Sequence, residues 1–271
     1  MTGVRVVAVV ARQTLRARAR ALAVWSLALM VLIALQLAAF PSVQGAAAGM
    51  EELLRNYPAA LQEAFGLDTF MSGAGFVHAE VFTLMAPLVL TAIAVSAGAG
   101  GTAQEEETGT ADLLFTTPVT RAQVLAGKAV AMLAAVTGPA LVLLATLAIG
   151  GRVVDLEVPF ARLAAAVTMT WLLAVVFGGV AVLVGAATGR RAPAVATAVA
   201  AGVAAFLGNV LGGLADWLSA WRSASPFRWA VGTRPVENGL DMGAALGLVA
   251  VTVALVLAAV AMLSRRDLRG R

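Results

Sequence analysis

The stretch that decides the fold runs from Leu163 to Arg191 and reads LAAAVTMTWLLAVVFGGVAVLVGAATGRR. A second apolar run, Ala192–Leu214, follows directly. Both runs exceed 20 residues without a charged side chain, and about 20 apolar residues are needed to cross the roughly 30 Å hydrocarbon core as an α-helix. Because only residues 188–191 separate them, we expect an antiparallel helical hairpin across a membrane.

Four more uncharged runs of this kind occur along the chain. The six expected spans are Ala21–Phe40, Val81–Gly100, Ala129–Gly151, Leu163–Ala187, Ala192–Leu214 and Met242–Leu263. Hydrophobic residues make up 61% of the chain and charged residues 13%, against about 45–50% and about 25% in soluble domains. The alternating segments of about 10 residues that build a β-barrel are not seen. The sequence predicts an all-α polytopic membrane protein, with one transmembrane domain over residues 1–271.

The basic residues predict the orientation of these spans, because lysine and arginine stay on the cytoplasmic side. With the N-terminus inside, the cytoplasmic segments hold 13 basic and 5 acidic residues (+8), and the outer segments hold 6 and 10 (−4). We therefore expect both termini in the cytoplasm. The net charge of +4 reflects this sorting, so no nucleic-acid partner is expected. Lys128 is the single lysine among 19 basic residues, and this bias towards arginine indicates a GC-rich bacterial genome.

The first twenty residues predict an amphipathic helix. At 100° per residue, Arg5, Arg12, Arg16 and Arg20 fall within one sector of about 80°. The opposite sector carries apolar residues, namely Val4, Val7, Val10, Ala11 and Leu15. Such a helix would lie under the inner leaflet with its arginines facing lipid headgroups; a basic disordered tail is the alternative. The apolar run that follows is longer than the 7–15 residues of a cleavable signal, so we expect an uncleaved anchor.

Several classes of function lack the residues that they require. The chain has no cysteine and one histidine, His78, so no metal site is expected. No ionisable residue lies inside a predicted span, which argues against proton- or sodium-driven transport and intramembrane catalysis. Gly127-Lys128 is followed by alanine and lacks the upstream glycine of a phosphate-binding loop. We therefore expect no enzyme and no cofactor in this chain.

The segment between the second and third spans, residues 102–121, is the most informative polar stretch. Thr102 with Glu105 and Thr120 with Gln123 each match a helix capping box. Between them lie three carboxylates, Glu105, Glu106 and Glu107, followed by a glycine that can interrupt a helix, Gly109, and a possible helix cap, Thr110. The apolar residues Leu113, Leu114 and Phe115 come next, and a turn at Pro118 and the basic residue Arg121 end the segment. This pattern predicts a short cytoplasmic helix that docks a partner protein. The alternative is an interfacial helix resting on lipid, where anionic headgroups would repel the carboxylates.

At these residues the sequence resembles the ABC type-2 exporter permeases. The shared motifs are Glu106-Glu107, Gly109-Thr110, Leu113-Leu114, Pro118-Val119-Thr120-Arg121 and Gly127-Lys128. The likeness continues at Tyr57-Pro58 to Phe65-Gly66, Gly189-Arg190-Arg191, Ser225-Pro226-Phe227 and Arg265-Arg266-Asp267-Leu268.

The resemblance implies a six-span permease subunit in the cell membrane. It implies an elbow helix over Thr2–Arg20, a coupling helix within residues 102–121 and short re-entrant helices at about residues 216–234. The implied partners are a second copy or a homologous permease, and two separate cytosolic ATPase subunits that bind ATP and Mg. By analogy the path is lined by spans two and five. The candidate path or dimer contacts are Thr91, Ser96, Phe206, Gly208, Asn209 and Gly212.

The expected function is export of a hydrophobic or amphipathic substrate, such as a drug, antibiotic or lipid-like molecule, because a path between these spans would be mostly apolar. The chain is only 6% aromatic, whereas a path for a sugar chain would need rows of aromatic residues. The alternative is a membrane scaffold or sensor that does not transport and recruits a cytosolic partner through the same helix.

Overall fold

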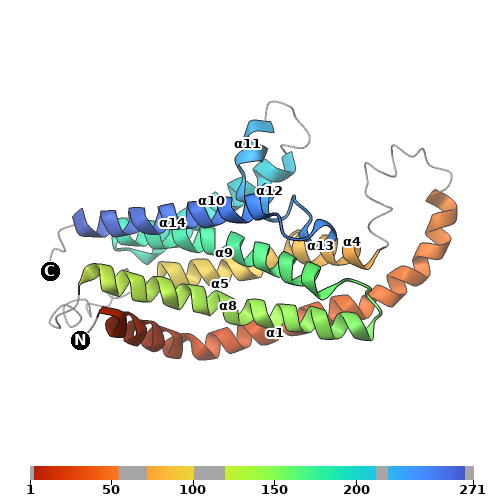
Figure 1. The fold of residues 1–271 in the computed structure, drawn as a ribbon, viewed down its shortest axis with the longest axis horizontal. Helices are drawn as coiled ribbons and strands as arrows, with labels where there is room; N and C mark the ends of the chain where they lie inside the picture. The colour runs from red at the N-terminus through yellow and green to blue at the C-terminus, as the bar shows by residue number, and fades with distance from the viewer. Residues whose placement is uncertain (1–2, 55–71, 101–119, 212–218, 266–271) are drawn as a thin grey trace.

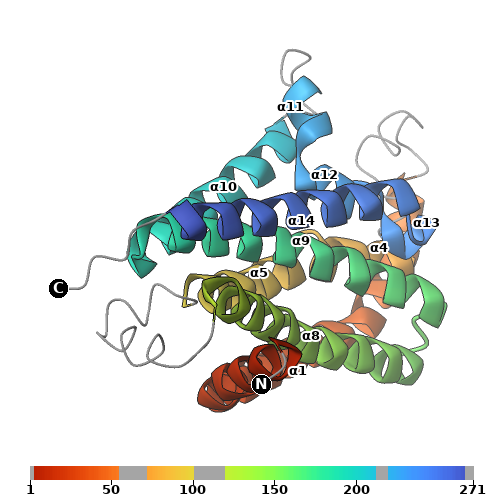
Figure 2. The same cartoon turned by 60° about the vertical axis from the view of Figure 1, so that its left-hand side comes forward.

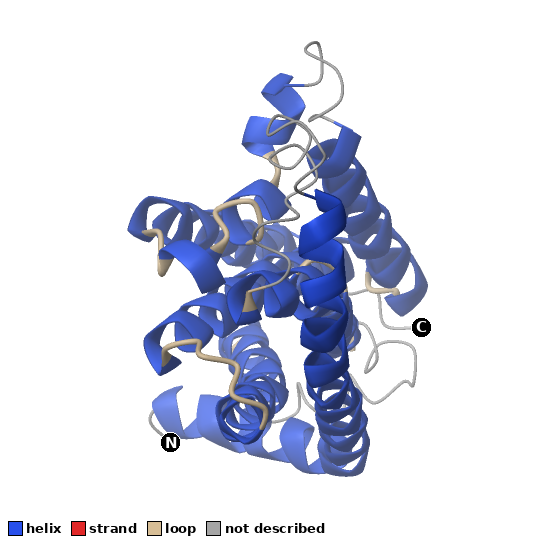
Figure 3. Ribbon diagram, turned by 90° about the vertical axis from the view of Figure 1, so that its right-hand side faces the viewer, coloured by secondary structure: helices blue, strands red, loops and turns tan. Residues whose placement is uncertain are grey.

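The computed structural model describes residues 3–54, 72–100, 120–211 and 219–265. Within these residues every regular element is a helix, and Figure 3 shows no strand among them. The elements are α1 (Gly3–Leu54), α4 (Gly73–Val77), the π-helix η1 (His78–Phe82), α5 (Met85–Ala99), α8 (Arg121–Val153), α9 (Phe160–Thr188), α10 (Arg191–Leu211), α11 (Ser219–Ala224), α12 (Pro226–Ala230), α13 (Pro235–Asn238) and α14 (Met242–Arg265). The predicted all-α class is confirmed.

Six helices in the described part of the chain are long and apolar enough to cross a membrane. They overlap all six predicted spans, with the second span entered through α4 and η1 before α5. Figure 1 shows that α1 begins and α14 ends at the same end of the bundle, as an even number of crossings requires. We therefore describe the protein as a multi-pass membrane protein.

Helix α1 joins two elements that were expected separately. The predicted elbow helix and the first span form one continuous helix, Gly3–Leu54, with Pro41 inside it. Figure 1 shows it as a long curved rod that crosses beneath α8 and extends past the bundle. The helical prediction for the N-terminal twenty residues is confirmed, but the elbow is not a separate element. Alanine, leucine and arginine favour helix throughout residues 15–30, so nothing in the sequence interrupts it there.

Helix α9 is the centre of the bundle. In its most apolar window 72% of the residues are buried, against 17% in α10 and in α14, and α5, α8, α10 and α14 all pack on it. Glycines permit this crowding. A Cβ atom on Gly178 would lie 2.6 Å from the sulfur of Met132 on α8, and one on Gly179 would lie 3.3 Å from Leu255 on α14. The indole Nε1 of Trp171 donates to Thr137 Oγ1 of α8 at 3.1 Å.

The turn between α9 and α10 has the form predicted for residues 188–191. Helix α9 ends at Thr188, Gly189 adopts φ 65° at the C-cap, and α10 begins at Arg191. A left-handed residue at this position is inexpensive only for glycine. The predicted hairpin is confirmed. It places the first turn of α10 at the end of the bundle where α1 begins, which the distribution of basic residues predicts to be cytoplasmic. We name this the cytoplasmic end and the opposite one the outer end.

At the other end of the bundle, short elements connect the long helices. Between α8 and α9, Asp155 and Glu157 both have positive φ, near 49° and 56°. This left-handed backbone on both sides turns Leu156 inwards, where it is buried against Gly73 and Gly151. Between α10 and α14 the chain forms α11, α12 and α13, consistent with short helices in this region. Figures 1 and 2 show α11 standing out from the bundle.

Candidate functional site

A groove lies between α5 and α10, the second and fifth membrane-spanning helices. Its volume is about 360 Å³, within the range of small-molecule sites. The lining residues of α5 and its N-cap recur every three or four positions from Leu84 to Ser96, and those of α10 do so from Arg191 to Phe206. One face of each helix therefore forms a wall. From Leu84 to Ser96 the groove extends about 18 Å along the bundle, at 1.5 Å per residue.

The groove is apolar along most of its length and carries a few polar groups. Leucine, valine, alanine and proline supply most of the lining. Thr91 contributes a buried hydroxyl oxygen with no hydrogen-bond partner among the described residues. Ser96 and Arg191 line the cytoplasmic end. Such a lining suits an apolar molecule with a small number of polar atoms.

Aromatic rings close the outer end of the groove. Phe206 of α10 meets Phe227 of α12 edge to face, with ring centroids 5.5 Å apart, and Phe177 of α9 lies 5.9 Å from Phe227 on its other side. Ser225 holds α12 in place, because its hydroxyl donates to the Ala205 carbonyl oxygen at 2.7 Å and accepts from the Phe227 amide. The short helix α12 is thereby tied to α10.

The structure brings together three of the four residues suggested for the path. Thr91, Ser96 and Phe206 all line the groove. Asn209 lies one turn beyond Phe206 and is not part of the lining; its buried Oδ1 has no hydrogen-bond partner among the described residues.

Two glycines, Gly208 and Gly212, were suggested as contacts, and the structure describes only the first. Gly208 is buried inside its own chain, because a Cβ there would collide with the indole of Trp221. Trp221 therefore packs against Gly208 within the same chain, and a contact of Gly208 with a second protomer stays a prediction. Gly212 lies outside the described residues.

The four arginines of the amphipathic N-terminal segment, Arg5, Arg12, Arg16 and Arg20, are all exposed. The opposite face was expected to be Val4, Val7, Val10, Ala11 and Leu15. Val6 and Ala11 are buried, and Val7 and Val10 pack against Gly127 of α8. Val4 is 80% exposed. The apolar face therefore packs on α8, with Val6 at its edge and Val4 outside it.

Arg18 is the functional candidate that was missed. At 100° per residue it falls among Val7, Ala11 and Leu15 rather than with the other four arginines, and this position is the signal that could have identified it. Its guanidinium donates to the Ser96 carbonyl oxygen at 3.0 Å and contacts Ser96 Oγ at 3.5 Å. It is also close enough to Arg191 for their charges to repel. Helix α1 thus contributes a charge at the cytoplasmic end of the groove.

The predicted docking segment lies largely outside the described residues. This applies to Glu105, Glu106, Glu107, Gly109, Thr110, Leu113, Leu114, Phe115 and Pro118. Arg121 is the first residue of α8, and the capping box before it is confirmed: Thr120 Oγ1 accepts from the Gln123 amide at 3.3 Å, and the Gln123 side chain accepts from the Thr120 amide at 3.0 Å.

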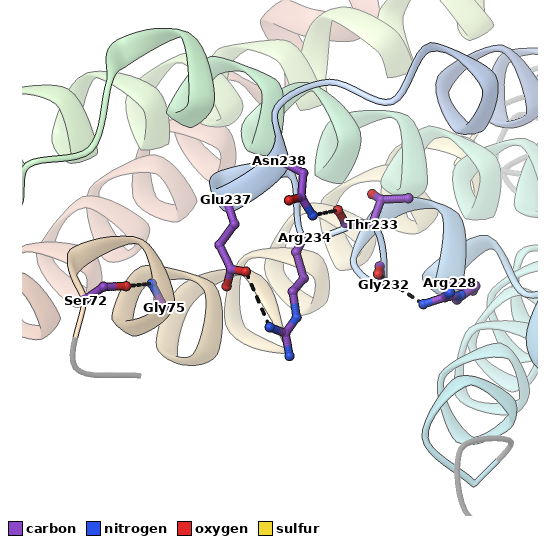
Figure 4. A network of polar contacts seen from close by, with 8 residues as sticks. All are labelled: Ser72, Gly75, Arg228, Gly232, Thr233, Arg234, Glu237 and Asn238. Atoms are coloured by element: carbon purple, nitrogen blue, oxygen red, sulfur yellow. Dashed lines mark hydrogen bonds and ion pairs between the residues drawn. The ribbon is translucent and has the colours of Figure 1, made fainter. Parts of the chain in front are cut away.

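Polar residues at the outer end form local contacts. Glu80 in η1 accepts from Gln36 of α1 at 3.1 Å. Figure 4 shows Arg234 paired with Glu237 at 3.4 Å and Asn238 donating to the Thr233 carbonyl oxygen. Among the described residues, no three histidine, cysteine, aspartate or glutamate side chains gather as a metal site would require. The first contact ties α1 to η1, and the other two hold α13 and the turn before it.

Six helices long and apolar enough to cross a membrane, with an apolar groove between the second and the fifth, define a multi-pass membrane protein. The family model for the ABC-2 family transporter proteins matches residues 8–268, and the chain belongs to this family. No curated protein matches the chain. Membership makes the chain a membrane subunit of an ABC transporter in the cell membrane, not itself catalytic, that partners with an ABC ATPase.

Proposed function

We propose that this permease subunit exports a hydrophobic or amphipathic substrate, and that the substrate moves along the groove between α5 and α10. The observation that carries this proposal is the groove itself, about 360 Å³ in volume and lined mainly by aliphatic side chains. Its two hydroxyl groups, at Thr91 and Ser96, can orient a polar atom of the substrate without the aromatic rows that bind sugars.

A second six-span subunit, identical or homologous, would complete the path. Helix α10 exposes a row of large apolar residues that includes two of the groove lining, Val199 and Val203, and continues with Leu207 and Val210. In a membrane such a surface faces lipid or another helix. A second copy packed there would enclose the groove between two protomers and shield the substrate from lipid.

The energy would come from two cytosolic ATPase subunits, which bind ATP and Mg. Within the described residues that line the groove there is no acidic side chain that could take up a coupling proton or sodium ion. The segment 102–121 directly follows α5, whose face forms one wall of the groove. A partner that moved this segment would therefore move α5, and we assign it as the coupling helix, Glu105 to Phe115.

The test begins with Leu113→Asp and Leu114→Asp in a chain co-expressed with its ATPase subunit. Each variant should abolish co-purification, because aspartate removes the apolar contact. Val4→Asp is the matched control, since Val4 is also cytoplasmic and is 80% exposed, and it should leave the complex intact. Unchanged complex formation by the Leu113 and Leu114 variants would contradict the coupling-helix assignment.

The second part measures ATP-dependent uptake of Nile red, a neutral lipophilic dye, into inverted membrane vesicles. Uptake should require both ATP and the intact complex. An intact complex that hydrolyses ATP but moves no apolar or amphipathic dye would contradict export and favour the scaffold or sensor function.

A further inference from the structure

The cytoplasmic end of the groove differs chemically from the rest of its length. Arg191, in the first turn of α10, is the one charged residue among the described groove-lining residues. Every other lining side chain is apolar or carries a hydroxyl group. A molecule that fills the groove would therefore meet a charged lining residue only at this end.

Arg18 strengthens this asymmetry from a different helix. It is held beside the groove by its hydrogen bond to the Ser96 carbonyl oxygen, and Ser96 is itself a lining residue. Two guanidinium groups from α1 and α10 are thus brought close enough to repel each other. Guanidinium groups bind carboxylate and phosphate oxygens with paired hydrogen bonds, so an anionic headgroup at this end would meet two cations.

The first turn of α10 adds to the same field. Arg191 opens a helix of 21 residues, and the amide groups at a helix N-terminus attract negative charge. The outer end of the groove offers the opposite chemistry, because it is closed by Phe206 and Phe227. The two ends thus suit the two parts of an amphiphile, with about 18 Å between Leu84 and Ser96.

We propose that the groove takes an anionic amphiphile, with its carboxylate or phosphate headgroup at Arg191 and Arg18 and its apolar tail along α5 and α10 towards Phe206. This inference rests on the proposed function, because it names the substrate class of the same groove. The headgroup chemistry is shared by a cargo molecule and by an anionic phospholipid of the inner leaflet, so the experiment must separate them.

The binding experiment uses the permease with its ATPase subunit in phosphatidylcholine nanodiscs. The probes are 11-(dansylamino)undecanoic acid and the trimethylammonium compound with the same dansyl group and chain length. The carboxylate should bind more tightly than the cation, and Arg191→Gln should weaken carboxylate binding about tenfold, the loss expected for one charged hydrogen bond. Arg190→Gln is the matched control. Arg190 is adjacent and exposed but is not part of the lining, so its variant should bind like the parent.

Equal binding of both probes, or equal losses in the Arg190 and Arg191 variants, would overturn the anionic site. Vesicle transport then separates the sources. ATP-driven movement of the carboxylate probe, lost in Arg191→Gln, supports a cargo site. Displacement of the probe by phosphatidylglycerol without any ATP-driven movement supports the anionic site and overturns its use in export. Movement of the cation instead of the carboxylate keeps the exporter and overturns the charge preference.

Discussion

A methyl group added at Gly98 should force apart the two helices at the centre of the bundle. Gly98 lies near the cytoplasmic end of α5, where α5 crosses α9. A Cβ atom there would press into the backbone carbonyl oxygen of Gly178 and lie 3.2 Å from Val182 Cγ2. A side chain could rotate away, but the carbonyl oxygen belongs to the backbone of α9. Gly98→Ala must therefore move α5 as a whole.

The size of this movement sets the expected loss of stability. Ordinary contact at a Cβ atom begins near 3.4 Å, so α5 must withdraw on the order of 1 Å, a gap that forfeits up to half of the dispersion energy of each contact. Overpacking of this kind costs about 1–3 kcal/mol. For a chain of this size the midpoint of thermal unfolding should fall by roughly 2–4 °C for each kcal/mol.

The assay is thermal unfolding of the purified permease followed by tryptophan fluorescence. Gly45→Ala provides the control, because Gly45 is in helix α1 and its Cβ would meet nothing within 4 Å. That variant should gain about 0.5–1 kcal/mol from the better helix propensity of alanine. If Gly98→Ala is as stable as Gly45→Ala, the close contact between α5 and α9 does not exist in the protein.

Two further changes test single polar contacts. Ser225→Ala should lower the free energy of unfolding by about 0.5–2 kcal/mol, because a helix cap is lost. It should also weaken binding of the dansyl carboxylate, because α12 carries Phe227 into the groove. Thermal unfolding and probe titration measure the two effects, and unchanged binding would show that α12 is held by other contacts. Trp171→Phe should cost about 0.5–1.5 kcal/mol by removing the hydrogen bond to Thr137. Trp25→Phe at an exposed position is its control in the same unfolding assay, and equal stability of the two variants would contradict the bond.

The long spans could be predicted because uncharged length alone distinguishes them. The run Leu163–Ala187 lies within Phe160–Thr188, and Met242–Leu263 lies within Met242–Arg265. Signals for their ends were also local. Thr120 with Gln123 marks a helix start through a reciprocal pair of hydrogen bonds, and Gly189 marks a helix end through its left-handed conformation. Such signals depend on residues three or four apart, so a sequence displays them directly.

Contacts between distant segments were harder to predict. Arg18 was missed although helical periodicity puts it on the apolar side of its helix, and nothing local indicates that Ser96, 78 positions away, is its partner. The contact of Gly208 with Trp221, 13 positions further along the chain, likewise has no local signal. The groove could be suggested only through family resemblance, because it depends on which faces of α5 and α10 turn towards each other. The docking segment lies outside the described residues and stays a prediction.

The central position of α9 has a consequence for how the protein is made. The translocon delivers helices to the lipid in order, and α9 is the fourth of six spans. When α9 leaves the channel, α5 and α8 are already present, and their residues Gly98 and Met132 can pack against Gly178 of α9. Helices α10 and α14 have not yet been made. The side of α9 that contains Gly179 therefore contacts lipid until α14, with Leu255, has been made. Assembly should therefore finish only after synthesis of α14, and ribosome-bound intermediates should acquire protease resistance at that late point.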